Sequence, residues 1–407
     1  MTSTSSARLL SASERSVYEA VPRLHVAPAP APQLRAVVII PVKDEADNLP
    51  HTLQALADQL DLQGRPLAPE LFEIIVLANN CHDQSAAVAR RFARAHPHLA
   101  LHVAEITLPP AYANIGWARR LLMDEACRRL EVVGCPGGFI ASTDGDTRVA
   151  PTWLALTQAE LLTHQVAAVT GRILAGSRNT GSSGRRHHLR DTAYRLLCAR
   201  LEAELDPCPN DPWPRHHQHF GASFAITVAA YRRVGGLPTV PYLEDQALYQ
   251  ALQRHDLRVR HSPSVRVFTS DRHEGRVAVG LSWQLREWEL LSARQQEPLV
   301  PGAACLVATL TLRRQLRHLW QEQQATGLPE VLLSEPSPQL VRTAQELNVS
   351  VVSLLLRLRH APFGELWHWV EQEVLTHSGW TQRWAALPLS QALLGLRQKL
   401  AAVRAGA

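Results

Sequence analysis

The sequence predicts an α/β fold in which a mostly parallel sheet is flanked by helices. Short runs of β-branched and apolar residues alternate with longer segments whose leucines recur at helical spacing. This alternation is typical of a parallel sheet whose strands are buried on both faces. Polar clusters also follow three of the expected strands, at the edge where such sheets bind ligands. Beyond about residue 287 the chain has mostly helical patterns, so we expect a mainly helical C-terminal extension over 288–407.

Each element follows from a local pattern. The run AVVIIPV at 36–42 is apolar throughout and favours a buried strand. By the same reasoning we expect strands at 72–80, 99–106, 137–146, 166–174 and 257–270, and helices at 43–60, 83–96, 114–130 and 153–165. Residues 1–35 are polar and then rich in Pro-Ala alternation, so we expect a flexible leader. Residues 176–215 are expected to be an irregular or partly helical insertion, either a floppy loop or a lid.

Composition narrows the class of protein. The formal net charge of +5 is small for 407 residues and the charges are mixed along the chain, so nothing indicates a nucleic-acid partner. The six cysteines are widely spaced, without a Cys-x-x-Cys pair, as expected for reduced thiols. No apolar run approaches the roughly 20 residues of a membrane span, and the N-terminus lacks an apolar signal core. We therefore expect a cytoplasmic protein without a transmembrane segment.

Two carboxylates lie one residue apart at the end of an expected strand. Asp144 and Asp146 in the stretch STDGD repel one another, and each raises the pKa of the other in an apolar setting. A hard cation such as Mg²⁺ or Mn²⁺ removes that repulsion. A solvated surface turn is the simpler interpretation of these residues alone. However, polar clusters also follow the strands at 36–42 and 72–80, and three aligned clusters favour a shared site.

Five segments occur in the order VVIIPVKDEADNL, VLANNCHDQS, STDGDTRV, GASFAITVAAYRRVGG and YLEDQALYQAL. Together they resemble the nucleotide-sugar-dependent glycosyltransferases of family 2, which have the GT-A fold. The resemblance covers roughly residues 36–287. It implies an enzyme that moves a sugar from a UDP-, GDP- or dTDP-linked donor to a hydroxyl acceptor, with Mn²⁺ or Mg²⁺ as cofactor. It also implies inversion at the transferred carbon.

The resemblance implies roles for single residues. Asp144 and Asp146 match the family's Asp-x-Asp pair, with Asp146 the direct metal ligand and Asp144 nearer the ribose or a metal-bound water. Asp245, which follows Glu244, matches the catalytic base. Asn79 lies where the family usually has an aspartate that accepts from the nucleotide base, which leaves the preference for uracil open. The other positions matched to donor binding are Pro41, Glu45, Asp83, Asn114 and Arg119.

The segment FTSDRHEGRV, at 268–277, adds three candidates. Arg272, His273 and Arg276 are expected to reach the diphosphate, and His273 or His261 is expected to complete the metal shell. A solvated loop is an equally good interpretation of these residues. We expect the histidines of RHHQHF to lie in an ordinary loop, because their spacing suits no standard zinc site. The helical extension is expected to serve acceptor recognition or self-association.

Three other functions compete with the transferase. A phosphohydrolase of the haloacid dehalogenase type would have its Asp motif on the first strand and a downstream lysine, but three strands precede Asp144 and the only later lysine is Lys399. A nucleotidyltransferase acting on a sugar phosphate would have a Gly-rich basic loop after the first strand, where this chain has PVKDEADNL. A non-catalytic protein that binds nucleotides or glycans is the third alternative, and Asp245 argues against it.

Overall fold

The computed structural model of the 407-residue chain describes residues 21, 23–175, 183–269, 287, 288, 290, 291, 293–325, 336–377 and 379–405. Within these residues, eight strands form one sheet with the order β3-β2-β1-β4-β7-β6-β8-β5. The strands are β1 (Ala36–Val42), β2 (Phe72–Asn79), β3 (Leu101–Ile106), β4 (Phe139–Ser142), β5 (Thr147–Val149), β6 (Ala168–Ala175), β7 (Phe224–Thr227) and β8 (Val259–Thr269). The expected α/β class with a mostly parallel sheet is confirmed.

The sheet is parallel in its first half and mixed in its second. β1 pairs in parallel with β2 and β4, and β2 pairs in parallel with β3. β7 runs antiparallel to both β4 and β6, and β5 runs antiparallel to β8. The short edge strand β5 lies directly after Asp144 and Asp146 and was not predicted. Its three residues are too few to show a periodic pattern.

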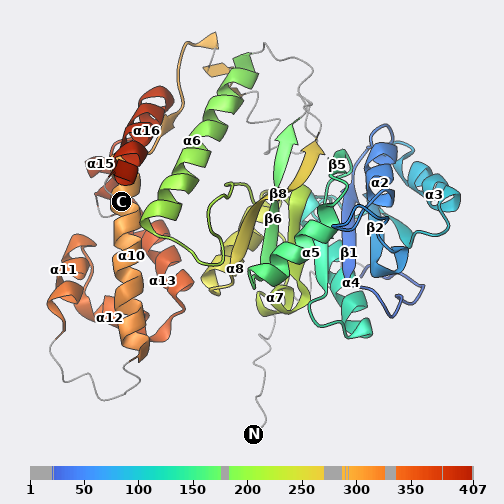
Figure 1. Cartoon of the computed structure of the whole chain (residues 1–407), viewed down its shortest axis with the longest axis horizontal. Coiled ribbons are helices and arrows are strands. Elements are labelled where there is room, and N and C mark those ends of the chain that lie inside the picture. The colour runs from blue at the N-terminus through green and yellow to red at the C-terminus, as the bar shows by residue number, and fades with distance from the viewer. Residues whose placement is uncertain are drawn as a thin grey trace, which may run out of the picture.

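Helices cover both faces of the sheet (Figure 1). One face carries α2 (Leu49–Ala57), α3 (Ser85–Ala95) and α5 (Trp153–Thr163), and the other carries α4 (Ile115–Val133), α7 (Val228–Arg233) and α8 (Glu244–Arg254). The leucines of α2 show why these segments are helical, since Leu49, Leu53 and Leu56 lie on one face and are fully buried. The two apolar faces of the sheet are thereby removed from water.

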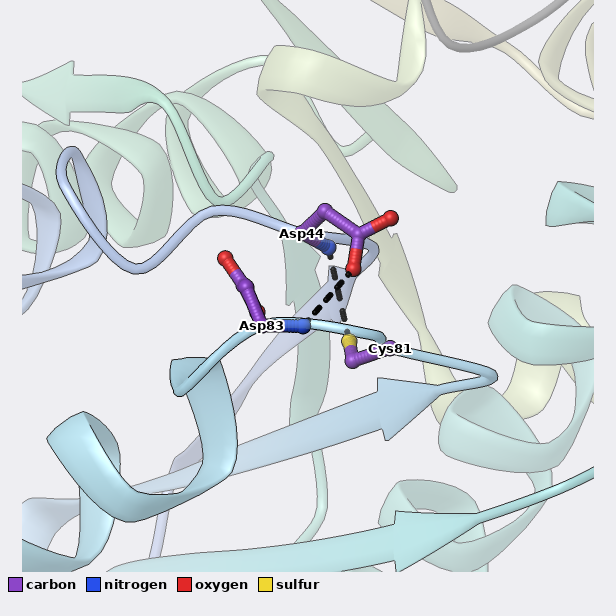
Figure 2. Close-up of side chains that lie close together, drawn as sticks. All are labelled: Asp44, Cys81 and Asp83. Atoms are coloured by element: carbon purple, nitrogen blue, oxygen red, sulfur yellow. Dashed lines mark hydrogen bonds between the residues drawn. The ribbon is translucent and has the colours of Figure 1, made fainter.

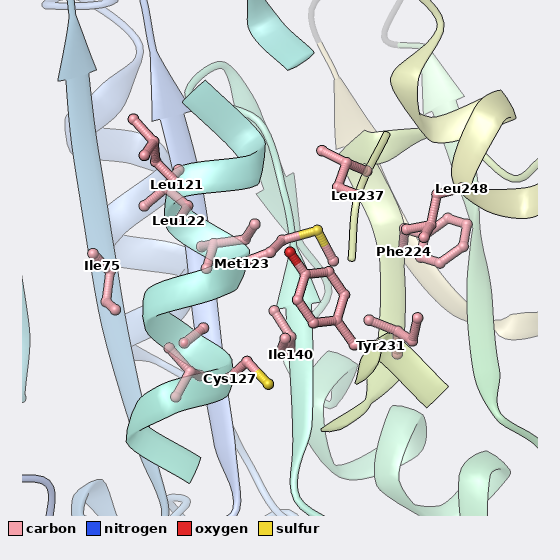
Figure 3. Close-up of a cluster of buried hydrophobic side chains, with 14 of the residues drawn as sticks. Ile75, Leu121, Leu122, Met123, Cys127, Ile140, Phe224, Tyr231, Leu237 and Leu248 are labelled. Carbon is pink, nitrogen blue, oxygen red and sulfur yellow. The ribbon is translucent and has the colours of Figure 1, made fainter. Parts of the chain in front are cut away.

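The longest helix of the sheet domain, α4, anchors one of these cores. Figure 3 shows Leu121, Leu122, Met123 and Cys127 of α4 among side chains of the strands and of α7. In the same cluster the hydroxyl of Tyr231 donates to Asp124 at 2.6 Å, which satisfies a phenol that is otherwise fully buried. The start of α4 is therefore held rigidly at the carboxyl edge of the sheet, where Arg119 lies.

The remaining helices form a second body beside the sheet domain (Figure 1). They are α6 (Ser183–Leu205), α10 (Ala303–Ala325), α11 (Pro338–Glu346), α12 (Val351–His360), α13 (Phe363–Trp369), a π-helical turn (Val370–Val374), α14 (Leu375–His377), α15 (Trp380–Arg383) and α16 (Leu389–Ala405), with a short ribbon of β9 (Leu299–Val300) and β10 (Leu387–Pro388). The expected helical C-terminal region is confirmed. The described residues contain no helix that is both long and apolar enough to cross a membrane.

Two regions were expected to have little regular structure. The described part of the insertion 176–215 contains the 23-residue helix α6, which packs with α10 and α16 in a shared apolar cluster. The described part of the leader, residues 23–35, packs on α4, where Val26 and Leu34 are buried and Arg129 donates to the carbonyl oxygens of Val26 and Pro28. These residues are therefore fixed to the sheet domain. The predicted domain boundaries themselves stay a prediction.

Candidate functional site

The loops after β1 and β4 meet at the carboxyl edge of the sheet. The side chain of Glu45 is buried against Gly145, and a Cβ added to Gly145 would lie 3.1 Å from Cγ of Glu45. The hydroxyl of Thr52 donates to the carbonyl oxygen of Gly145 at 3.0 Å. These contacts fix the backbone at Gly145, so the neighbouring residues Asp144 and Asp146 have a defined backbone position.

Arg119 joins the acidic residues of two motifs that are 100 residues apart. Its Nη2 donates to Asp144 at 2.8 Å, and its Nη1 donates to Glu244 at 2.9 Å. The side chains of Arg119 and Glu244 are each 5% exposed, whereas that of Asp144 is 36% exposed. The buried half of this network is therefore structural, and Asp144 presents its carboxylate to the outside.

Negative charge exceeds positive charge in this network. Burial raises the pKa of Asp144, and the neighbouring carboxylates of Asp146 and Asp245 raise it further, against the opposing effect of Arg119. Burial likewise raises the pKa of Glu244, again against Arg119. One guanidinium does not neutralise these four acidic groups, so an additional cation at the exposed side of Asp144 is electrostatically favourable.

Asp245 lies in the first turn of α8, next to Glu244. Its Oδ2 accepts from the backbone N–H of Gly221 at 2.8 Å, and its Oδ1 accepts from the N–H of Gln246 at 2.7 Å. The residue before the helix, Leu243, has φ of 56°, a left-handed conformation that is uncommon for a non-glycine residue. The chain thus turns sharply before α8, and the N-terminal end of this helix faces the acidic site. That end carries the positive pole of the helix dipole, which favours nearby negative charge.

Several buried polar atoms at this edge have no hydrogen-bond partner among the described residues. They are Asn79 Oδ1, Ser142 Oγ, Thr143 Oγ1 and Arg119 Nε. Unpaired buried polar atoms are rare, and they are expected where a bound ligand or water completes the set. A cavity of about 10 Å³, room for one water molecule, lies between Arg119, Ser142, Gly221 and Asp245. The edge is therefore polar and incompletely satisfied.

A second acidic group lies between the loops after β1 and β2. Figure 2 shows Asp44, Cys81 and Asp83, whose ligand atoms lie within 4.8 Å of one another. Asp44 Oδ1 accepts from the N–H groups of His82 at 2.6 Å and Asp83 at 3.3 Å, and Asp83 Oδ2 accepts from that of Ala46 at 2.9 Å. Backbone N–H groups thus occupy these carboxylates. The cluster is explained as a tie between the two loops.

The structure brings together most of the sequence-predicted site residues. Asp144, Asp146, Arg119, Glu244 and Asp245 form the acidic network, and Pro41, Glu45 and Asn79 lie at the ends of the neighbouring strands β1 and β2. Asn114 caps α4 by accepting from the N–H of Trp117 at 3.1 Å, and Asp83 accepts from the N–H of Ser85 at 2.9 Å near the start of α3. A donor-binding role for each of these residues stays a prediction. Arg272, His273 and Arg276 lie outside the described residues.

Sequence reasoning missed two residues of the site. Ser142 and Gly221 line the small cavity with Arg119 and Asp245. Gly221 was part of the matched segment GASF but received no role of its own. A Cβ added to Gly221 would lie 1.5 Å from Nη1 of Arg119, so any side chain there must displace the Arg119 guanidinium. This packing relation joins residues about 100 positions apart and has no signal in the local sequence.

The metal that the family resemblance implies can be tested against these residues. Asp144 and Asp146 provide oxygen ligands of the kind that Mg²⁺ and Mn²⁺ prefer. In the described part of the chain they belong to no group of three close His, Cys, Asp or Glu ligand atoms. Two carboxylates in a negatively charged setting fit an ion that leaves positions for phosphate oxygens and water. The residues present therefore fit the implied ion.

Comparison with known proteins gives a family. The profile described as Glycosyl transferase family 2 matches residues 37–213, and no curated protein matches the chain significantly. Among solved structures, S. aureus TarS 1-349 in complex with UDP is 12% identical, with a TM-score of 0.41 over 86% of this chain and 92% of that one. The mannosyltransferase PcManGT from Pyrobaculum calidifontis, in complex with GDP-Man and Mn²⁺, is 17% identical, with a TM-score of 0.40 over 95% of this chain and 85% of that one.

Glucosyl-3-phosphoglycerate synthase from Mycobacterium tuberculosis is also 17% identical, with a TM-score of 0.37 over 69% of this chain and 88% of that one. These structural likenesses are too distant to bear on function. The family match includes β1, β2, β4 and the Asp144–Asp146 pair. The match over residues 37–213 confirms the resemblance to glycosyl transferase family 2, and this part of the chain is a glycosyltransferase domain.

Proposed function

We propose that this glycosyltransferase moves a sugar from a nucleoside diphosphate donor to a hydroxyl group, with inversion at the transferred carbon and with a divalent ion. The single observation that carries the proposal is that Asp144 and Asp245 both lie close to the buried Arg119–Glu244 pair. It places a half-exposed, cation-attracting carboxylate near a second carboxylate that backbone N–H groups hold in one orientation.

The donor would lie along the carboxyl edge of the sheet. Asp146 and Asp144 would hold the ion, which supplies positive charge to the departing diphosphate. Asn79, at the end of β2, has a side chain that is 7% exposed and an Oδ1 without a partner among the described residues. We assign it to the nucleotide base, where the amide oxygen accepts and the amide nitrogen donates.

The transfer would be a single displacement. The acceptor oxygen forms a bond to the anomeric carbon while the bond from that carbon to the phosphate oxygen breaks. The electron pair leaves with the diphosphate, and the acceptor proton passes to Asp245, the general base. The N–H groups of Gly221 and Gln246 fix the carboxylate for this task.

The first experiment is a thermal-stability panel. UDP, GDP, CDP and dTDP are each added with and without Mn²⁺ or Mg²⁺ to the wild-type chain and to Asp146→Ala. The proposal predicts a rise in Tm that needs both nucleotide and metal and that disappears in Asp146→Ala. It also predicts that Asn79→Ala reduces the difference between bases. The absence of stabilisation by every nucleotide would contradict the proposed donor.

A further inference from the structure

The histidines of the loop before Gly221 are close to the proposed base. His216 is 3% exposed, and burial lowers the pKa of His217 to about 3. Burial also lowers the pKa of His219, so these rings are neutral near pH 7. The sequence predicted an ordinary loop here. The structure has a loop here that contacts α6 and α8, with His216 buried and His217 and His219 half-buried. The proposed function gives these histidines no role.

His219 is bound to the first two turns of α8. Its Nε2 hydrogen-bonds the side-chain oxygen of Gln246, and its ring stacks on Tyr249 with centroids 4.2 Å apart and planes 5° apart. Gln246 and Tyr249 lie three residues apart and so share one face of the helix. The ring therefore fixes the position of its loop on α8 in two ways.

The two backbone N–H groups that donate to Asp245 belong to a residue close to His219 along the chain and to a residue that His219 contacts. Gly221, whose N–H bonds Oδ2, lies two residues after His219 along the loop. Gln246, whose N–H bonds Oδ1, is the residue that His219 contacts through its side chain. Because His219 is neutral, its effect on Asp245 is geometric rather than a matter of opposite charge.

The ring of His219 also contacts His261, which is itself held by buried charged residues. His261 lies edge-on to His219 at 6.5 Å and to Tyr249 at 5.6 Å. His261 Nδ1 bonds Asp211 at 2.8 Å, and Asp211 also accepts from Arg215 at 3.1 Å. Arg215 continues to Glu202 of α6 at 2.5 Å, and Glu202 accepts from Arg313 of α10 at 2.5 Å. Polar contacts therefore link the helical region to His261, and edge-on ring contacts link His261 to His219 and Tyr249.

We propose that His219 is a positioning residue for Asp245, held in place by the helical region through His261 and the buried charges behind it. This inference rests on the proposed function, because it takes Asp245 as the general base. It gives the helical region a specific task in the reaction. Removing the ring would let the loop and the first turn of α8 separate, and the carboxylate of Asp245 would lose its two fixed donors.

The test compares His219→Ala and His219→Gln with wild type. Glutamine keeps a side-chain donor for Gln246. His255→Ala is the matched control, because His255 lies just beyond the other end of the same helix and its ring bonds the carbonyl oxygen of Ala251, away from Asp245. Amide hydrogen exchange is measured for peptides covering residues 219–226 and 244–250 of the full chain. Release of nucleoside diphosphate is measured with UDP-glucose, UDP-N-acetylglucosamine and GDP-mannose, each with Mn²⁺.

We expect His219→Ala to speed exchange in both peptides by about tenfold, the effect of losing one hydrogen bond and a ring contact. We expect kcat to fall at least as much while the donor KM changes little, and His219→Gln to recover most of both losses. Wild-type exchange rates in His219→Ala, or an equal effect of His255→Ala, would overturn the inference. Full turnover in Asp245→Asn would instead overturn the proposed base, and the exchange result would still decide the role of His219.

Discussion

Gly221 lies directly against the guanidinium of Arg119. A Cβ at Gly221 would be 1.5 Å from Nη1 and 2.3 Å from Cζ, which no side-chain adjustment short of displacing Arg119 relieves. The same glycine donates its N–H to Asp245. The Arg119 pairs and the Asp245 carboxylate therefore depend on one residue without a side chain.

This contact predicts the effect of adding a methyl group. We expect Gly221→Ala to displace Arg119 from Asp144 and Glu244 and to remove nucleotide-dependent stabilisation. The measurement is the rise in Tm with UDP or GDP and Mn²⁺. Gly395→Ala is the control, because the nearest atom to its added Cβ is 3.6 Å away, an ordinary contact. Normal nucleotide stabilisation in Gly221→Ala would contradict the account.

The Arg119–Glu244 pair predicts a coupled effect on stability. Arg119→Met leaves the buried Glu244 without its cation, and such losses cost about 3–5 kcal/mol of the free energy of unfolding. Glu244→Met added to Arg119→Met removes the unpaired charge, so we expect the double variant to recover part of that loss. Urea unfolding of the two single variants and the double variant measures the coupling. Strictly additive losses would show that the two side chains do not act as a pair.

Gly364 of α13 packs closely against the end of α8 and so connects the helical region to the sheet domain. A Cβ at Gly364 would lie 1.7 Å from the carbonyl oxygen of Gln253, and the N–H of Gly364 donates to Asp256 at 2.8 Å. We expect Gly364→Ala to lower the free energy of unfolding by more than 1 kcal/mol. Gly395→Ala, in α16, should instead raise it by about 0.5–1 kcal/mol because alanine favours helix. Equal effects of the two substitutions on urea unfolding would contradict this contact.

The lowered pKa of Glu297 predicts that the free energy of unfolding depends on pH in the acid range. Ser390 and Arg190 lower the pKa of Glu297 from its ordinary value of 4.5 to about 2. A lowered carboxyl pKa stabilises the folded chain above pH 4.5, and this stabilisation is lost as the pH falls from 4.5 to 2. We therefore expect Glu297→Gln to be less stable than wild type at pH 6, with a difference that shrinks below pH 4.5. Glu346→Gln, at an exposed position of α11, should follow the wild-type curve, and an unchanged pH dependence in Glu297→Gln would reject the prediction.

The central strands and the acidic pairs could be predicted because their signals are local. The run at 36–42 is apolar at every position, and β1 occupies those residues. Asp144 and Asp146 stand one residue apart directly after an apolar run, and the structure places them at the carboxyl edge of the sheet, near Asp245.

The rest depends on contacts between distant residues. Helix α6 was not predicted as a long helix because its polar and apolar residues do not alternate with a clear helical period. Its apolar residues are covered by α10 and α16, which come much later in the chain. His219 gave no signal because its partners, Gln246, Tyr249 and His261, come from two other elements of the chain. The same reason hid the glycine requirement at position 221, which only the neighbouring Arg119 imposes.

The most direct test of the central claim is nucleotide binding with and without Mn²⁺, measured by calorimetry on wild type, Asp146→Ala and Asp245→Asn. The account predicts that the wild-type chain binds one of UDP, GDP, CDP or dTDP only with the metal, that Asp146→Ala loses this binding, and that Asp245→Asn keeps it while losing turnover. Binding that persists unchanged in Asp146→Ala, or no nucleotide binding at all, would contradict a metal-dependent donor site at the end of β4.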